Sequence, residues 1–155
     1  AAAEMAEEGL THAEIVSRVQ DMIPRTKIYV CLNTLAYAVR GGRVPDTVGK
    51  IGNFLGMRPI MTLDSAGSGA AFGVAFSQSA LTKKIMRLVQ NTASRKGIAE
   101  YSIVHGGNLL LANEYAEQIK RITGKEPAFI SEISSVVALH AGPGTVAVCL
   151  VEGAA

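Results

Sequence analysis

The stretch "VVALHAGPGTVAVCLV", from Val136 to Val151, places a histidine and a Gly-Pro-Gly corner inside an otherwise apolar run. Its first half is typical of a short helix, and "GTVAVCLV" after the corner has the apolar, β-branched composition of a buried strand. A helix that leads directly into a strand favours an α/β domain. His140 stands at the expected boundary, either as a structural residue of a helix end or as a side chain held toward a ligand.

Outward from this stretch, helical and strand patterns alternate along the chain. The turn-rich "SAGSG" joins two strand patterns as a hairpin. Strands are expected over 27–32, 58–64, 70–76, 100–105, 127–133 and 144–151. Helices are expected up to Gly9, from a Thr11 capping box to Pro24, over 33–40 and 46–56, after Ser77, from Asn108 to Gly124, and over 134–140. We therefore predict an α/β fold with a mixed β-sheet of about six strands and flanking helices.

The composition fits one compact domain of 155 residues with an aliphatic core, because 48% of the residues are hydrophobic and only 5% are aromatic. The net charge of +2 is small and dispersed, which argues against nucleic-acid binding. Cys31 and Cys149 lie in apolar runs, so we expect free thiols and a cytoplasmic location. No run is long enough to span a bilayer, and no signal peptide opens the chain. The start "AAAEMAEEG" suggests a helix already under way, so we expect a piece of a longer protein.

His140 and the glycines Gly142 and Gly144 form the first candidate site. The glycines tolerate backbone angles that other residues resist, and they leave backbone amides without side-chain cover. An imidazole beside such amides suits a carboxylate or a phosphate. The alternative is a helix C-cap followed by an ordinary turn.

Two further Gly-Gly stretches are candidates for anion binding. In "RGGRV", Arg40, Gly41, Gly42 and Arg43 would combine close backbone approach with guanidinium donors. The alternative is a glycine C-cap with basic residues at a helix end. "HGGNLL", from His105, is the weaker case, since it also fits a plain strand-to-helix turn.

The residues offer no support for catalysis, a metal or a cofactor. The sequence has no CxxC, HExxH, Walker A or strand-following GxGxxG motif. Asp46 and Asp64 are isolated and fit turns. Ser134 and Ser135 lie near His140 in sequence, but no nucleophile elbow or oriented acid accompanies them. We therefore expect a protein that is not an enzyme.

Three motifs in a fixed order give the chain a family resemblance. "TLAYAVRGGRV" is similar to Leu-x-x-Leu-x-x-Gly-Gly-Arg-Ile, "LGMRPIMTLDSAG" to Leu-x-Ile-Lys-Pro-Ile-Leu with Arg58 in place of the lysine, and "LHAGPGTVAV" to His-x-Gly-Pro-Gly. Together with the opening from Gly9 to Ile15 and the strand that ends in His105, they resemble the C-terminal half of the DegV family of bacterial fatty-acid-binding proteins. The resemblance covers nearly all of residues 1–155.

The resemblance implies the C-terminal lipid-binding domain of a two-domain carrier. Such a carrier holds a long-chain fatty acid between its domains and presents the carboxylate to an ATP-using fatty acid kinase, a step of phospholipid metabolism. It implies that His140 joins the hydrogen bonds at the carboxylate, that Gly142 and Gly144 shape the corner, and that Arg43 lies near the head group or the kinase. Arg40, Gly41, Gly42 and His105 are weaker candidates.

Two departures from the family pattern accompany the resemblance. "FSQS", from Phe76 to Ser79, stands where the family often carries basic residues, which counts against kinase docking there. The N-terminal domain, with its Ser and Thr ligands for the carboxylate, is expected to be a missing partner of this chain. Two other functions remain open: an α/β enzyme fragment that binds a phosphorylated small molecule through Arg40 and Arg43, and a structural domain whose glycines serve turns.

Overall fold

The computed structural model describes residues 1–43 and 56–153. Asp46 and almost all of the helix expected over 46–56 lie outside the described residues. The helices are α1 (Ala2–Glu7), α2 (His12–Met22), the 3-10 helix η1 (Ile23–Arg25), α3 (Ala36–Arg40), α5 (Gln78–Lys96), α6 (Leu109–Thr123) and α7 (Ser135–Ala141). The strands are β1 (Thr26–Cys31), β2 (Arg58–Leu63), β3 (Gly69–Ala75), β4 (Ile98–His105), β5 (Ile130–Glu132) and β6 (Val146–Glu152).

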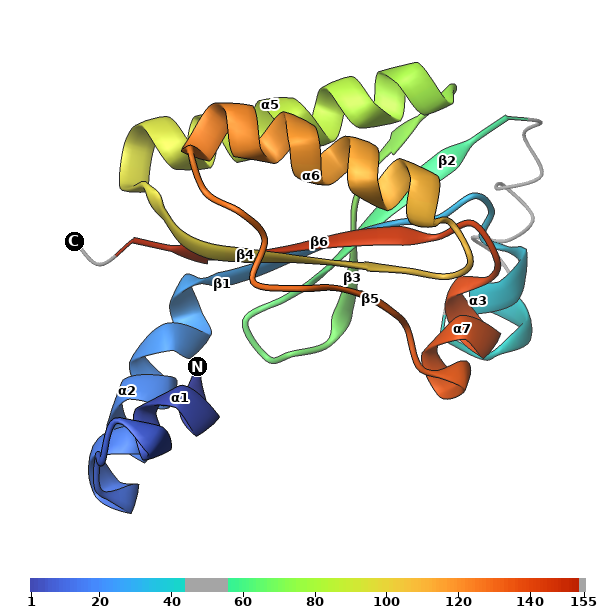
Figure 1. Cartoon of the computed structure of the whole chain (residues 1–155). Coiled ribbons are helices and arrows are strands. Elements are labelled where there is room, and N and C mark those ends of the chain that lie inside the picture. Colours follow the sequence, from blue (N-terminus) through green and yellow to red (C-terminus); the bar gives the residue numbers. More distant parts are fainter. Residues whose placement is uncertain (44–55, 154–155) are drawn as a thin grey trace.

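The described strands form one six-stranded sheet in the order β3-β2-β1-β6-β4-β5 (Figure 1). Its pairs are antiparallel except for β4 and β5, so the predicted mixed sheet is confirmed. The strand expected over 127–133 is shorter than predicted, since only Ile130–Glu132 forms regular pairs. Pro127 has no amide hydrogen to donate, which disfavours a regular ladder at that point.

Side-chain caps at the predicted residues define the starts of α2, α5 and α6. Thr11 and Glu14 form the reciprocal capping box of α2. The Ser77 hydroxyl accepts from the amide of Ala80 at the start of α5, and the Asn108 side chain caps α6. These bonds satisfy backbone donors that a helix N-terminus leaves unpaired.

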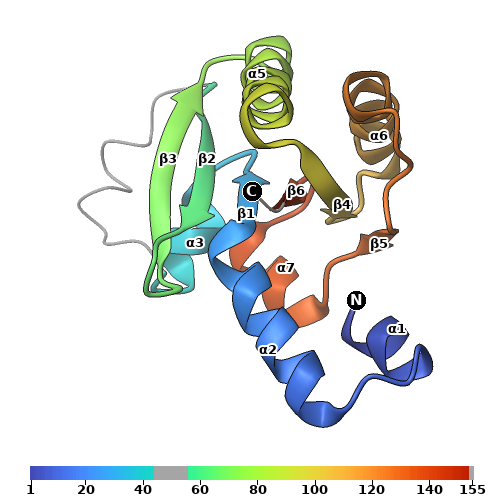
Figure 2. The same ribbon diagram turned by 90° about the vertical axis from the view of Figure 1, so that its left-hand side faces the viewer.

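Helices α5 and α6 lie side by side over one face of the sheet (Figures 1 and 2). They bury the main core between themselves and the strands, because the apolar residues of α5 repeat at helical spacing. The largest fully buried side chains of this core include Tyr101, Tyr115, Ile85, Ile103 and Leu150.

The opposite face of the sheet is covered at one end only. There α3 and α7 pack on each other, around a second small core of Leu32, Leu35, Ala38 and Ala141. At the other end, α1 and α2 extend away from the sheet and contain no buried residue (Figure 2). The middle of this face is therefore left without a covering helix among the described elements.

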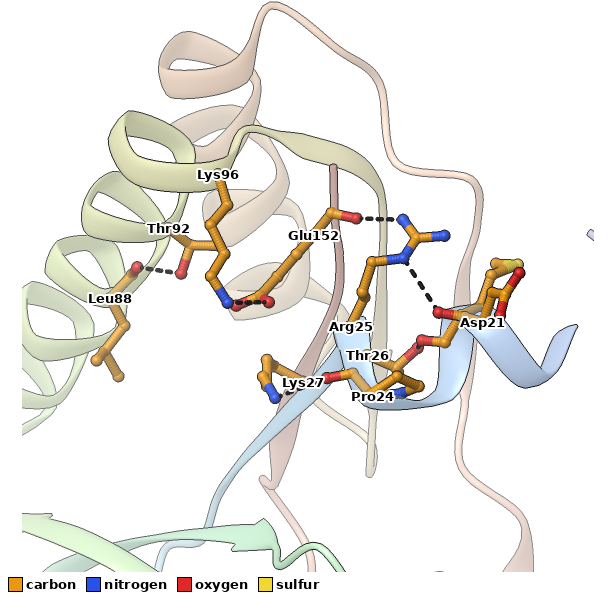
Figure 3. Close-up of polar contacts among 10 residues, drawn as sticks. Asp21, Pro24, Arg25, Thr26, Lys27, Leu88, Thr92, Lys96 and Glu152 are labelled. Atoms are coloured by element: carbon orange, nitrogen blue, oxygen red, sulfur yellow. Dashed lines mark hydrogen bonds and ion pairs between the residues drawn. The ribbon is translucent and has the colours of Figure 1, made fainter. Parts of the chain in front are cut away.

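The C-terminal end of β6 is tied to its neighbours through Glu152 (Figure 3). Its carboxylate pairs with Lys96 of α5 at 2.7 Å, and its carbonyl oxygen accepts from Arg25 at 2.8 Å. Arg25 also donates to the carbonyl of Asp21, so η1, α5 and β6 are joined at one edge.

Within the described residues, none of the helices has the length and hydropathy that a bilayer crossing requires.

Candidate functional site

The strand order brings the three candidate motifs to the same edge of the sheet. Val146, the first residue of β6, pairs with Cys31 at the end of β1 and with His105 at the end of β4. The residues that follow β1, those that follow β4 and those that precede β6 therefore lie together. They come from three separate parts of the sequence, which follow Cys31, follow His105 and precede Val146.

The Gly-Pro-Gly corner is a packed turn in which one side chain from the β1–α3 connection and one from α3 lie against the glycines. Gly142 and Gly144 have φ angles of +81° and +80°, which disfavour any residue with a Cβ. A Cβ on Gly142 would lie 2.4 Å from the ring of Tyr37, and one on Gly144 would lie 2.0 Å from Nδ2 of Asn33. Asn33 also donates through Nδ2 to the carbonyl of Pro143 at 3.1 Å.

The expectation that the amides of this corner are open to an anion is wrong. The amide of Gly142 donates to the carbonyl of Ala138 at 2.8 Å, and the amide of Gly144 donates to the carbonyl of Gly106 at 2.7 Å. Both donors serve the fold, because buried or half-buried amides are paired within the chain wherever possible. The glycines thus shape the corner, and a ligand there would need side-chain donors.

His140 lies in the last turn of α7, directly over Gly41 at the end of α3. A Cβ on Gly41 would lie only 1.9 Å from Nδ1 of His140. The Nδ1 atom is buried and has no hydrogen-bond partner within residues 1–43 and 56–153, while the side chain as a whole is only half-buried. The Nδ1 side of the imidazole is therefore packed, while the residue as a whole keeps some exposure to solvent.

The Arg-Gly-Gly-Arg stretch is the end of α3, and its amides are also occupied. Those of Gly41, Gly42 and Arg43 donate to the carbonyls of Tyr37, Val39 and Ala38. This is the C-cap alternative, and it removes close backbone approach to an anion. Gly41 acquires a different role, since only a residue without a side chain leaves space for His140. Arg40 and Arg43 are exposed, and Arg43 donates to the carbonyl of Gly41 at 3.1 Å.

His105 lies behind the corner, on the side away from α3. Its side chain is 4% exposed, and its Nδ1 has no partner in the described part of the chain. The hollow next to it has a volume of about 400 Å³ and is also lined by Glu132, Ser135 and Pro143. The following Gly106 packs against the corner, because its amide donates to the carbonyl of Thr145 at 2.8 Å. The expected strand-to-helix turn is confirmed.

Three residues near the corner had no role in the sequence-based site. They are Tyr37 and Asn33, which cover the glycines, and Arg58, whose guanidinium donates to Oδ1 of Asn33. The sequence signal for Asn33 is weak, because Asn33 is only a polar residue just after a predicted buried strand.

Within residues 1–43 and 56–153, the chain has no group of three or more His, Cys, Asp or Glu that could hold a metal ion.

Comparison with known proteins gives a consistent result. The model of the DegV family, described as "Uncharacterised protein, DegV family", matches residues 1–153. A DegV domain-containing protein of Streptomyces coelicolor is 30% identical over 151 residues, covering 96% of this chain and 52% of that protein. One from Clostridium perfringens is 28% identical over 153 residues, covering 53% of its length.

Solved structures agree with the sequence relatives. A DegV family protein from Eubacterium eligens, loaded with heptadecanoic acid, superposes with a TM-score of 0.85 at 25% identity, over 99% of this chain and 54% of that one. A stearic-acid-binding protein from Eubacterium ventriosum has a TM-score of 0.81 at 18% identity, over 96% of this chain and 52% of that one, a likeness of fold alone. The chain thus spans about half the length of the relatives it matches.

Proposed function

The chain belongs to the DegV family, and on that premise we propose that it is the C-terminal lipid-binding domain of a carrier for a long-chain fatty acid. His140 contacts the carboxylate, and the protein is a binding protein without enzymatic activity of its own. The observation that carries the proposal is the position of His140, which packs on Gly41 beside the Gly-Pro-Gly corner and is only half-buried. The relative from Eubacterium eligens that holds heptadecanoic acid supports the ligand class.

The uncovered face of the sheet offers apolar surface for the acyl tail. Ile28 of β1 and its register partner Cys149 lie on this face, and Val30 lies nearer the corner, against the small core of α3 and α7. Ile28 and Cys149 also line a groove of about 580 Å³, to which Leu63 of β2 contributes. The strand rise places Ile28 roughly 10 Å from Cys31, the last residue of β1, and the corner lies just beyond that end. An acyl chain that follows this face from the groove would bring its carboxylate to the corner.

The two ends of the ligand make unequal contributions to binding. Burial of about fifteen methylenes contributes about 12 kcal/mol gross at ~0.8 kcal/mol each. A charge-assisted hydrogen bond adds only about 1.5–3 kcal/mol. The tail therefore sets the affinity, and His140 sets the position of the carboxylate and the choice of head group.

Presentation of the carboxylate to a fatty acid kinase is the second part of the proposal. A carboxylate beside the half-buried His140 stays accessible at the surface. The exposed Arg43 lies two residues from Gly41 and is a candidate contact for the head group or for the kinase. The test is formation of acyl phosphate from the loaded protein, ATP and the kinase of the same organism.

The second candidate function is an α/β enzyme fragment that binds a phosphorylated small molecule through Arg40 and Arg43. The exposed guanidiniums of both residues favour it, while the occupied amides of Gly41 and Gly42 count against it. It predicts that phosphate esters compete for this loop and that no lipid accompanies the purified protein.

The deciding experiment is native mass spectrometry of the full-length gene product that includes this chain, followed by mass analysis of an organic extract. A fatty acid in the complex and in the extract supports the carrier. Reduced retention of that fatty acid after His140→Ala supports the head-group contact. A lipid-free gene product that also fails to take up added hexadecanoic acid contradicts the carrier proposal.

A further inference from the structure

We propose that Arg58 is a further cationic contact for the anionic head group, that Asn33 holds it at the corner, and that it makes the site prefer a fatty acid over the corresponding alcohol. The inference rests on the proposed carrier function and adds a residue that determines head-group specificity. Three observations support it: the position of Arg58 in the sheet, its link to the Gly-Pro-Gly corner, and the charge around it.

The position of Arg58 follows from the sheet register. Arg58 is the first residue of β2, which runs antiparallel to β1. Next to it, the amide of Leu32 donates to the carbonyl of Pro59 at 2.9 Å, just beyond the last strand pair. Arg58 therefore stands beside Asn33 at the edge of the sheet where the candidate motifs meet.

A single side chain connects Arg58 to the corner. The Nη1 group of Arg58 donates to Oδ1 of Asn33. The amide nitrogen of the same asparagine donates to the carbonyl of Pro143 at 3.1 Å and lies over Gly144. Asn33 is thus oriented at both ends of its amide group, which fixes the guanidinium relative to the corner that precedes β6.

The charge of Arg58 is not neutralised by the part of the chain that the structure describes. None of the ion pairs found among residues 1–43 and 56–153 involves Arg58, and its described partner, Asn33, is neutral. A guanidinium has five N–H donors, and the described residues accept from one of them, an N–H of Nη1 that is directed to Asn33. Because the side chain is half-buried, solvent screens this charge less than that of the exposed Arg43.

This arrangement selects for anionic head groups. A guanidinium with free donors in a fixed orientation can bind a carboxylate or a phosphate through two parallel hydrogen bonds. A hydroxyl group offers neither the charge nor the second acceptor. Arg58 and His140 would therefore act on the head group from two sides of the corner, and removal of Arg58 should affect acids more than alcohols.

The test compares hexadecanoic acid with hexadecan-1-ol, which share the tail, on the full-length gene product. Arg58→Gln removes the charge, Arg58→Lys keeps it without the fork, and Asn33→Asp places a carboxylate against the guanidinium. Arg121→Gln is the matched control, because Arg121 is an exposed arginine at the far end of α6. The start of α6 is at the corner, where Asn108 donates to the carbonyl of Gly144, and Arg121 lies about 20 Å from Asn108 along the helix axis. Dissociation constants are measured by calorimetry for each variant and each ligand.

We expect Arg58→Gln and Asn33→Asp to weaken binding of the acid by about tenfold or more, the loss of one charge-assisted bond. Binding of the alcohol should change by less than about twofold, and Arg58→Lys should fall between the parent and Arg58→Gln. Arg121→Gln should match the parent.

An unchanged ratio of acid to alcohol affinity in Arg58→Gln and Asn33→Asp overturns the assignment while leaving the carrier function intact. An equal loss for both ligands in all three variants also overturns it, since Arg58 would then act only on the fold. If the parent binds neither ligand, the proposed carrier function fails, and the assignment fails with it.

Discussion

Replacement of Gly41 by alanine should displace the imidazole of His140 without straining the backbone. Gly41 has φ −80° and ψ 1°, a negative-φ conformation that alanine can also adopt, so the added Cβ is the main change. That Cβ would lie 1.9 Å from Nδ1 of His140, whereas ordinary contacts begin near 3.4 Å. The ring must therefore move by about 1.5 Å or rotate out of place.

A movement of this size exceeds the tolerance of a hydrogen bond, whose donor and acceptor lie about 2.7–3.2 Å apart. If His140 binds the carboxylate, Gly41→Ala should cost most of a charge-assisted hydrogen bond, about 1.5–3 kcal/mol. This corresponds to a roughly 10- to 150-fold weaker affinity for hexadecanoic acid. The fold should be little affected, because residue 41 lies at a helix end beside a half-buried side chain.

The assay is a double-mutant cycle on the full-length gene product with Gly41→Ala, His140→Ala and the combination. Gly69→Ala is the control, since a Cβ on Gly69 meets nothing within 4 Å and Gly69 has no positive φ. We expect the combination to bind no more weakly than His140→Ala alone. Parental affinity in Gly41→Ala, or fully additive losses in the combination, would refute the idea that Gly41 acts by leaving space for His140.

Three more predictions concern stability and reactivity. Gly142→Ala should lower the free energy of unfolding by about 1 kcal/mol or more beyond the loss in Gly9→Ala. Both glycines have a positive φ, but only Gly142 has a side chain against it. Equal losses of the two variants in urea denaturation would contradict this. Lys96→Ala should cost about 1–2 kcal/mol by leaving the buried carboxylate of Glu152 unpaired, and the same variant in a Glu152→Gln background should cost clearly less. Burial raises the pKa of the Cys31 thiol to about 12, so at about pH 8 a disulfide reagent should label it only as fast as the chain unfolds, and rapid labelling under native conditions would show that the thiol is accessible.

Much of the fold could be predicted from the sequence because its signals are local. The capping box at Thr11, the cap at Ser77 and the helix from Asn108 to Gly124 each depend on residues within a few positions of one another. The hairpin between β2 and β3 follows from its turn, where Oδ1 of Asp64 accepts from two amides of the loop. Such patterns specify their structure without knowledge of the rest of the chain.

The site could be predicted only in part, since its contacts join distant segments. Nothing near Gly144 in the sequence indicates that Asn33 will lie against it, and nothing near Gly41 indicates His140. These neighbours follow from the strand order, which places β1 next to β6. The sequence could therefore identify the motifs, but not the side chains that cover them.

The glycines of the candidate site show why structural and binding interpretations of a motif need not exclude each other. Gly41 caps α3, as the structural interpretation predicts, and the same residue leaves the space that His140 occupies. The amides expected to bind an anion are instead bonded within the fold. In the proposed site, an anion would instead be recognised by side chains that the packed corner holds in place, His140 on one side and Arg58 through Asn33 on the other. If the proposal holds, a methyl group added to Gly41 or Gly144 should weaken this recognition, because it would displace His140 or Asn33.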